Sequence, residues 1–249
     1  MSSAAYIKEE KDFYVTARDS KDIFIRYAAA NDNPDRKAVV LAHGICGQPE
    51  EYIHMFARNY FTEKGYDVYR MSFYDDGDNS RKIHTTTLLL QANDMNDVIS
   101  HAKESHDKVY VCGHSYGGAT ILFANPDTNA TAFWDSSFDV TRFWKDVKII
   151  DGKPMTQSWR INMLFNPEMM EHANSQSTEN MESLAQSISS PSVVITALKH
   201  DMVDQSKNIF KSLTCEKEYH EIANAKHRFT QGDTALELYN ATHQWFERF

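Results

Sequence analysis

Residues 109–118 read Val-Tyr-Val-Cys-Gly-His-Ser-Tyr-Gly-Gly. A short apolar run that passes at once into a glycine-rich turn predicts a buried strand followed by a helix. The turn has the form G-x-S-x-G, in which the glycines on either side remove side chains that would collide in a very sharp bend. Such a bend lifts the hydroxyl of Ser115 clear of the sheet, at a helix N-terminus that favours developing negative charge. We therefore expect Ser115 to be a nucleophile.

A second glycine loop follows an earlier apolar run. Residues 38–42 read Ala-Val-Val-Leu-Ala, as expected of a strand buried on both faces, and His43-Gly44-Ile45-Cys46-Gly47 comes directly after it. In this position the backbone N–H of Ile45, together with that of Tyr116, would form an oxyanion hole, in which each donor contributes a few kcal/mol. An ordinary strand-to-helix turn is the alternative. Cys46 is expected to be a packed structural thiol.

Strand-like and helix-like runs alternate along most of the chain, which predicts a mostly parallel sheet with crossover helices. The opening differs, because two alternating runs separated by a four-residue turn predict an N-terminal hairpin over residues 12–17 and 22–28. Further strands are expected at 38–42, 66–73, 109–112, 130–134, 192–197 and 216–222, and helices at 50–63, 88–102, after the turn at Ser115 through 124, and 234–249.

Residues 136–190 interrupt this alternation. The segment is rich in large apolar side chains and shows no clear strand, so we expect a small helical cap inserted over the site, with packing of its own small core as the alternative. The side chains concerned are Phe138, Phe143, Trp144, Trp159, Met163, Phe165, Met169 and Met170. Since repeats and linkers are absent from the sequence, residues 1–249 are expected to form a single domain with this insertion.

The two glycine loops and the order of the later segments resemble the α/β-hydrolase superfamily, and the similarity extends from the first hairpin to the last helix. The resemblance implies an α/β-hydrolase fold and a catalytic triad in the chain order serine, acid, histidine, each on a loop at the carboxyl end of a strand. It also implies that neither a metal nor another cofactor is needed.

Eleven histidines compete for the role of general base. His227 fits best, because it follows the strand expected near Ile222 and precedes the last helix, as the superfamily's terminal histidine does. His220 falls within the preceding strand, His243 within the final helix, and His114 is the variable residue of the G-x-S-x-G turn.

Three aspartates are candidates for the triad acid. Asp201 follows the strand at 192–197 and matches the superfamily's usual position, so it is expected to orient His227 and to stabilise its charged form. Asp135 ends the preceding strand, where some members of the superfamily carry their acid. Asp204 is the third candidate, although it would more naturally cap the following helix.

Composition excludes several classes of protein. The formal net charge of −9 argues against a nucleic-acid-binding surface and against attraction to anionic membranes. The sequence shows neither a signal peptide nor an apolar run long enough for a membrane span, and its three scattered cysteines have no metal-type spacing, so we expect a cytoplasmic protein. The acidic loop Asp75-Asp76-Gly77-Asp78 lacks the full spacing of a calcium loop.

These observations favour a serine hydrolase that cleaves a small or medium apolar carboxylic ester through an acyl-enzyme. Thioesterase, amidase, peptidase and C–C hydrolase activities use the same triad and stay open as alternatives. A non-catalytic small-molecule binding protein on the same fold is the alternative from another class. A nucleotide-binding protein is disfavoured, because residues 43–47 form neither a G-x-G-x-x-G motif nor a P-loop. Oligomeric state is left open.

Overall fold

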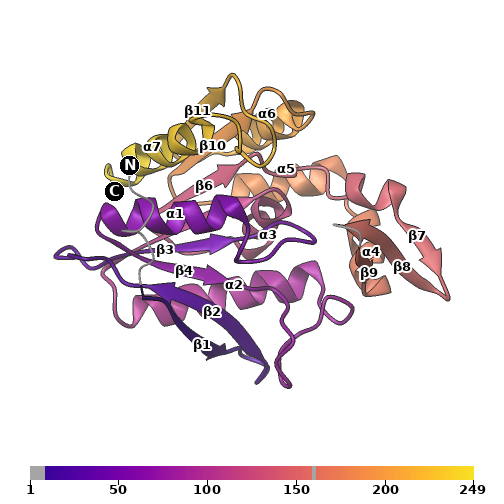
Figure 1. Ribbon diagram of the computed structural model, residues 1–249. Helices are drawn as coiled ribbons and strands as arrows, with labels where there is room; N and C mark the ends of the chain where they lie inside the picture. Colours follow the sequence, from indigo (N-terminus) through magenta and orange to yellow (C-terminus); the bar gives the residue numbers. More distant parts are fainter. Residues whose placement is uncertain (1–8, 159–160) are drawn as a thin grey trace.

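The computed structural model describes residues 9–158 and 161–249. Its centre is an eight-stranded sheet in the order β1-β2-β4-β3-β5-β6-β10-β11 (Figure 1). The strands are β1 (Lys11–Thr16), β2 (Asp22–Ala28), β3 (Lys37–Ala42), β4 (Tyr66–Met71), β5 (Lys108–His114), β6 (Ala130–Trp134), β10 (Ser192–Ala197) and β11 (Lys217–Ile222). Every strand expected from the sequence is present, with ends that differ by a few residues.

Strand direction follows the sequence pattern. β1 and β2 form the expected antiparallel hairpin, and β2 runs antiparallel to β4. From β4 to β11 all neighbouring strands are parallel. The central strands β3 and β10 are buried along their whole length, which explains their unbroken apolar sequences. Because β5, β6, β10 and β11 are parallel, the loops after them emerge at the same edge of the sheet.

Helices cover both faces of the sheet and bury two apolar cores. On one face, α1 (Tyr52–Glu63) packs beside α7 (Thr234–Phe246) over a core that contains Phe61, Trp134 and Trp245 (Figure 1). The opposite face is covered by α2 (Leu88–Lys103), α3 (Tyr116–Ala124) and α6 (Val203–Ser212). The result is the three-layer arrangement predicted from the alternation of strands and helices.

The inserted segment differs from the expected helical cap. After the short 3₁₀ helix Arg142–Asp146 it forms an antiparallel three-stranded sheet, β7 (Lys148–Ile150), β8 (Lys153–Ser158) and β9 (Ile161–Leu164), and only then the helices α4 (Pro167–Asn174) and α5 (Thr178–Ser187). The expectation that it holds no strand is therefore wrong. The strands escaped prediction because they are short and carry exposed apolar residues, such as Ile149 and Ile161, instead of a clear alternation.

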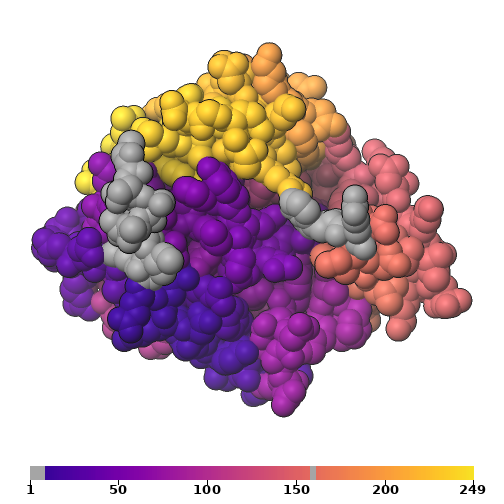
Figure 2. Space-filling model, in the orientation of Figure 1, coloured from indigo at the N-terminus to yellow at the C-terminus, as the bar shows by residue number. Residues whose placement is uncertain are grey.

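Part of the insertion belongs to the main core. Trp144 and Phe165 are buried and pack edge to face, with ring centroids 5.3 Å apart, and Met169 on α4 joins the same cluster as α2 and α3. The β7–β9 sheet itself stands out at one side of the molecule (Figure 2). The predicted contribution of Trp159 lies outside the described residues.

Candidate active site

Ser115 occupies a strained turn between β5 and α3. Its backbone angles are φ 57° and ψ −121°, outside the regions open to ordinary L-residues, and conformations of this kind cost about 1–3 kcal/mol. Gly113 shows why the turn needs glycine, because a Cβ there would lie 2.6 Å from the carbonyl oxygen of Gly117. The sharp bend predicted for residues 113–117 is thus present, and strain of this kind clusters at functional sites.

Hydrogen bonds fasten this turn to the neighbouring strand. The N–H of Ser115 donates to the carbonyl oxygen of Trp134 at 3.0 Å, and the N–H of Ser137 donates to the carbonyl oxygen of Ser115 at 2.9 Å. The backbone on both sides of Asp135 is therefore bound to the backbone of Ser115. These bonds fix the loop after β6 beside the nucleophile turn.

Asp135 is the carboxylate that contacts His227. Its Oδ2 lies 2.6 Å from Nδ1 of His227, and its Oδ1 accepts hydrogen bonds from Thr196 Oγ1 at 3.2 Å and from the N–H of Ala197 at 3.1 Å. A carboxylate only accepts, so Nδ1 of His227 carries the proton and Nε2 is left as the basic nitrogen. This arrangement corresponds to the acid and base of a triad.

The charge of Asp135 is stabilised by its surroundings. The side chain is fully buried, and burial alone would raise its pKa, but the contacts from His200 and His227 and the hydrogen bond from Ala197 outweigh burial. The pKa of Asp135 is consequently held well below its ordinary value, so the carboxylate stays ionised at any pH near neutrality.

Asp201 does not contact His227, which corrects the expectation from the sequence. Its side chain is 68 % exposed and pairs with Arg142. Three residues, 198–200, separate the end of β10 from Asp201. The carboxylate of Asp201 therefore lies too far along the loop to contact His227. Asp204, the third candidate, lies in the first turn of α6. The N-cap of that helix is Met202, so Asp204 does not occupy the capping position expected from the sequence.

His200 takes a place at the site that sequence reasoning missed. Its ring stacks on that of His227 at 4.4 Å, with 23° between the planes. Its Nδ1 lies 2.9 Å from Asp135 Oδ2, at an angle poor for a hydrogen bond, so the contact is mainly electrostatic. Its Nε2 is 3.3 Å from Asp201 Oδ1. The predicted acid thus touches the site only through His200.

The predicted oxyanion loop lies against the nucleophile. A Cβ on Gly44 would be 2.9 Å from Cβ and 3.3 Å from Oγ of Ser115, so this glycine permits close approach of the loop. The N–H of Gly47 donates to the carbonyl oxygen of Gly44 at 3.0 Å, which closes the turn around Ile45. Tyr116 is the first residue of α3, where an N–H has no intrahelical acceptor. The use of the Ile45 and Tyr116 amides as oxyanion donors remains a prediction.

The other histidines considered for the base are engaged elsewhere. His114 is buried, and its Nε2 donates to the carbonyl oxygen of His227 at 2.8 Å. His220 on β11 is 2.5 Å from Glu218 Oε1, and His243 on α7 lies 3.3 Å from the hydroxyl of Tyr66. Of the four candidates weighed from the sequence, His227 is therefore the one that the fold places on Asp135.

A cavity of about 420 Å³ adjoins these residues, within the size range of small-molecule sites. Three of its wall residues are sequence neighbours of predicted site residues: Cys46 follows Ile45, His114 precedes Ser115, and Arg228 follows His227. Apolar side chains from two elements complete the wall, namely Tyr52 and Ile53 at the start of α1 and Ile161 and Met163 on β9. The insertion therefore contributes to the cavity, as a cap would.

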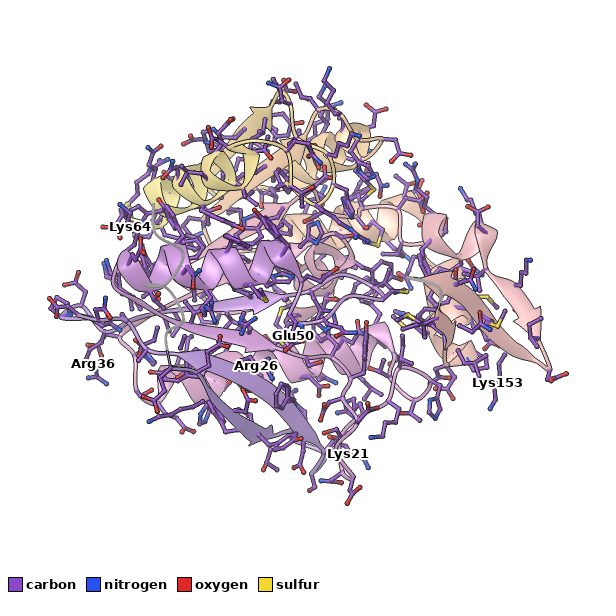
Figure 3. The ribbon with its side chains drawn as sticks, in the orientation of Figure 1. Lys21, Arg26, Arg36, Glu50, Lys64 and Lys153 are labelled. Carbon is purple, nitrogen blue, oxygen red and sulfur yellow. The ribbon has the colours of Figure 1, made fainter. Side chains whose placement is uncertain are left out.

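A second cavity of about 660 Å³ lies beside the first, and both share Gln48, Glu50, Ile161 and Met163 in their walls. Its rim is polar. Arg26 on β2 and Glu50 lie close together in Figure 3, with Nη1 and Oε1 3.0 Å apart. The acidic loop also borders this cavity, and Asp75 there accepts hydrogen bonds from Tyr14 and from the N–H of Gly77, each at 3.0 Å.

Two groups of side chains in the described residues have the composition of a metal site. One is Asp135, His200 and His227, in which both histidines already contact the carboxylate. The other is Glu51, His54 and His114 at the wall of the first cavity. Cys46 lies nearby, but burial and the charge of Glu51 raise the pKa of its thiol to about 12, which leaves it protonated.

Comparison with known proteins agrees with this architecture. The family model described as serine aminopeptidase, S33, matches residues 33–132, from the approach to β3 into β6. That segment includes Ser115 but ends before Asp135 and His227. A search of curated protein sequences finds no match. None of the helices within residues 9–158 and 161–249 is long and apolar enough to cross a membrane.

Many solved structures share the fold at low sequence identity. Est1E from Butyrivibrio proteoclasticus, solved with ferulic acid bound, superposes with a TM-score of 0.78 at 15% identity, covering 94% of this chain and 99% of its own. The esterase domain of a Rhodothermus marinus protein gives 0.74 at 16% identity, with 96% and 98% covered. An esterase from Pyrococcus furiosus gives 0.71 at 15% identity, with 100% and 96% covered.

These likenesses show the fold, and the matched family model supports a hydrolase, without fixing a substrate. The resemblance seen in the glycine loops is thereby confirmed: the chain has the α/β-hydrolase fold, and the two structures named first cover 94% and 96% of it.

Proposed function

We propose that this protein is a serine hydrolase that cleaves a small or medium apolar carboxylic ester through an acyl-enzyme on Ser115. The observation that carries the proposal is the 2.6 Å contact between Asp135 and His227, beside a serine held at φ 57°. A protein that only bound a ligand would need neither the strained serine nor a buried carboxylate fixed on a histidine.

The reaction follows from the positions of these groups. His227 Nε2 takes the proton of Ser115 as Oγ attacks the ester carbonyl, and Asp135 stabilises the imidazolium that forms. The oxyanion rests on the backbone N–H groups of Ile45 and Tyr116. As the tetrahedral intermediate collapses, the C–O bond to the alcohol breaks and His227 returns the proton to the leaving oxygen. Water, deprotonated by His227, then releases the acid from Ser115.

The cavity supports an apolar substrate. Its walls from α1 and β9 are largely apolar, and its volume admits a small or medium acyl or alcohol group. Since Ile161 and Met163 come from the insertion, the substrate range is set partly by a segment outside the main sheet. Ferulic acid is bound in the structure of Est1E, which is a different protein. It suggests that aromatic esters should be among the substrates tested here.

A fluorophosphonate probe tests the proposal directly, because it labels an activated serine. We expect wild-type protein to be labelled and Ser115→Ala to remain unlabelled, with unchanged circular dichroism. p-Nitrophenyl esters of increasing chain length should be hydrolysed, with turnover reduced at least ~10³-fold in Ser115→Ala. Absence of label and of turnover in folded wild type would overturn the proposal in favour of a binding protein.

A matched p-nitroanilide separates ester from amide substrates. The matched family model is that of a serine aminopeptidase, and the same triad would serve an amidase. We expect ester turnover to exceed anilide turnover for the same acyl group. A preference for the anilide would leave the proposed triad in place, but the proposed substrate would then be an amide and not an ester.

A further inference from the structure

The wall of the first cavity contains a group of side chains for which the proposed reaction has no use. Glu51 precedes α1, His54 lies in its first turn, and His114 ends β5. One ligand atom from each lies within 4.8 Å of the others. Glu51 is the N-cap residue of α1 and His54 lies three positions later, with 3.9 Å between Glu51 Oε2 and His54 Nε2.

The two histidines present unpartnered ring nitrogens although both are buried. His54 is 1% exposed, and among the described residues neither of its ring nitrogens has a hydrogen-bond partner. The nearest carboxylate oxygen, Glu51 Oε2, is 3.9 Å from its Nε2, too far for a hydrogen bond. Buried ring nitrogens without partners are rare, and a bound ion is one of the few explanations.

His114 is oriented as a metal ligand would be. Its Nε2 donates to the carbonyl oxygen of His227, because a carbonyl only accepts, and the neutral ring therefore carries its lone pair on Nδ1. Nδ1 is the buried nitrogen that has no partner among the described residues. Metal-bound histidines commonly donate their second ring N–H to a backbone carbonyl in this way.

The donor set of the group also suits a cation. Two imidazoles and one carboxylate are the ligand set of many three-ligand zinc sites.

We propose that Glu51, His54 and His114 bind a divalent borderline cation of the zinc type, with the fourth coordination position open to the cavity. In a tetrahedral shell the ligand atoms lie about 3.3 Å apart, so the ligand atoms, which lie within 4.8 Å of one another, must approach by at most about 1.5 Å. Glu51 supplies that adjustment, because its side chain is at the cavity wall and 23% exposed.

The test uses metal-free full-length protein and ZnCl₂, and it does not depend on hydrolase activity. By calorimetry we expect one equivalent of Zn²⁺ to bind and, by thermal melting, a Tm that rises with Zn²⁺ concentration. MgCl₂ should produce neither effect, because Mg²⁺ prefers oxygen ligands. His54→Ala and Glu51→Gln should each weaken Zn²⁺ binding by at least ~10-fold.

Two controls decide where the cation binds. His101 and Glu104 form an exposed pair on α2 with the same three-residue separation, so His101→Ala should leave Zn²⁺ affinity unchanged. His200→Ala tests the rival group at Asp135. A loss of affinity in His200→Ala but not in His54→Ala would overturn the proposal.

Folding of the variants is checked by circular dichroism in EDTA. If His54→Ala does not fold, Glu51→Gln carries the test, because that residue is at the cavity wall and keeps its size. Undiminished Zn²⁺ binding in folded Glu51→Gln, or no binding by wild type, would also refute the site.

Discussion

Asp135 on the loop after β6, and not Asp201 on the loop after β10, holds His227, with 2.6 Å between Oδ2 and Nδ1. The two carboxylates belong to neighbouring parallel strands, so their loops leave the sheet at the same edge. One is fully buried and receives hydrogen bonds from β10, while the other is 68 % exposed and pairs with Arg142. Burial and hydrogen bonds therefore distinguish the carboxylate that contacts His227 from the one that does not.

Asparagine substitutions distinguish these two aspartates by their effect on turnover. Asp135→Asn removes the charge that orients and stabilises His227, and we expect kcat on a p-nitrophenyl ester to fall by ~10³- to 10⁴-fold. Asp201→Asn breaks an exposed ion pair with Arg142 and weakens the 3.3 Å contact with His200, neither of which reaches His227, so kcat should change less than about threefold. A much larger fall of kcat in Asp201→Asn than in Asp135→Asn would instead indicate that Asp201 is the acid.

His200 is expected to act as a positioning residue through its contacts with Asp135 and His227. His200→Ala removes the stacked ring and one of the two imidazole contacts on the carboxylate. We expect kcat to fall on the order of 10-fold, with KM nearly unchanged, since polar contacts to an ionised group contribute about 1.5–3 kcal/mol. His200→Phe should restore stacking but not the polar contact, so a full rescue by Phe would show that packing alone matters.

Gly44 is expected to set the distance between the oxyanion loop and the nucleophile. In Gly44→Ala the new methyl group would lie 2.9 Å from Ser115 Cβ and must displace the loop or the serine. We expect kcat to fall by ~10- to 100-fold, the range seen when donors or nucleophile are misplaced by about 1 Å. Tm is the control: a loss of activity fully explained by unfolding would contradict this role.

Met163 is expected to tune chain-length preference from the β9 side of the cavity. Met163→Ala enlarges the cavity and removes apolar contact, so kcat/KM for longer acyl chains should change more than that for acetate, by roughly fourfold per affected methylene at about 0.8 kcal/mol each. Ile149→Ala on β7 is the matched control, because this exposed residue lines neither of the two cavities described. Equal effects on all chain lengths would argue against an acyl pocket here.

The stability of the fold should depend on pH through His43. Its Nδ1 donates to the carbonyl oxygen of Gly44 at 2.8 Å, while its Nε2 accepts from the N–H of Phe73 at 3.1 Å, so the buried ring is neutral. Burial lowers its pKa from 6.5 to about 4. The unfolded chain therefore binds more protons between these values, and the free energy of unfolding falls as pH drops from about 6.5 to 4.

This loss amounts to about 3 kcal/mol for His43 alone, and other buried histidines add to it. Urea unfolding across the window should show a steep dependence in wild type. His43→Asn should lower the slope by up to about 1.4 kcal/mol per pH unit, since one proton fewer is taken up on unfolding. An unchanged slope would mean that His43 is not neutral in the folded protein.

The sequence was sufficient for the sheet, the hairpin and the turn at Ser115, because each depends on local patterns: apolar runs for buried strands and paired glycines for a sharp bend. The predicted position of His227, between β11 and α7, is also observed. The choice of acid was not local. Asp135 and Asp201 both follow strands, and the side chain that reaches His227 is decided by hydrogen bonds from β10 and by the positive φ of 42° at Asp135.

Two other features could not be predicted from the sequence, because they too depend on more than local patterns. β7–β9 form a small sheet from short segments whose apolar residues remain exposed, so periodicity gave little signal. His54 and His114 come together only in the folded chain, where their ring centroids lie 6.2 Å apart. The Glu-x-x-His spacing at residues 51–54 was a signal for them, but its third partner is some 60 positions away.

The proposed nucleophile Ser115, acid Asp135 and base His227 lie on the segments that follow β5, β6 and β11, so the serine is synthesised more than a hundred residues before the histidine. In a ribosome-bound chain that has formed only the earlier strands, the hydroxyl of Ser115 would be unreactive, because His227 is not yet in place to deprotonate it. Chains grow from the N-terminus at some 5–20 residues per second, which leaves an interval of several seconds. Ser115 therefore becomes reactive only after β11, the last strand, has joined the sheet.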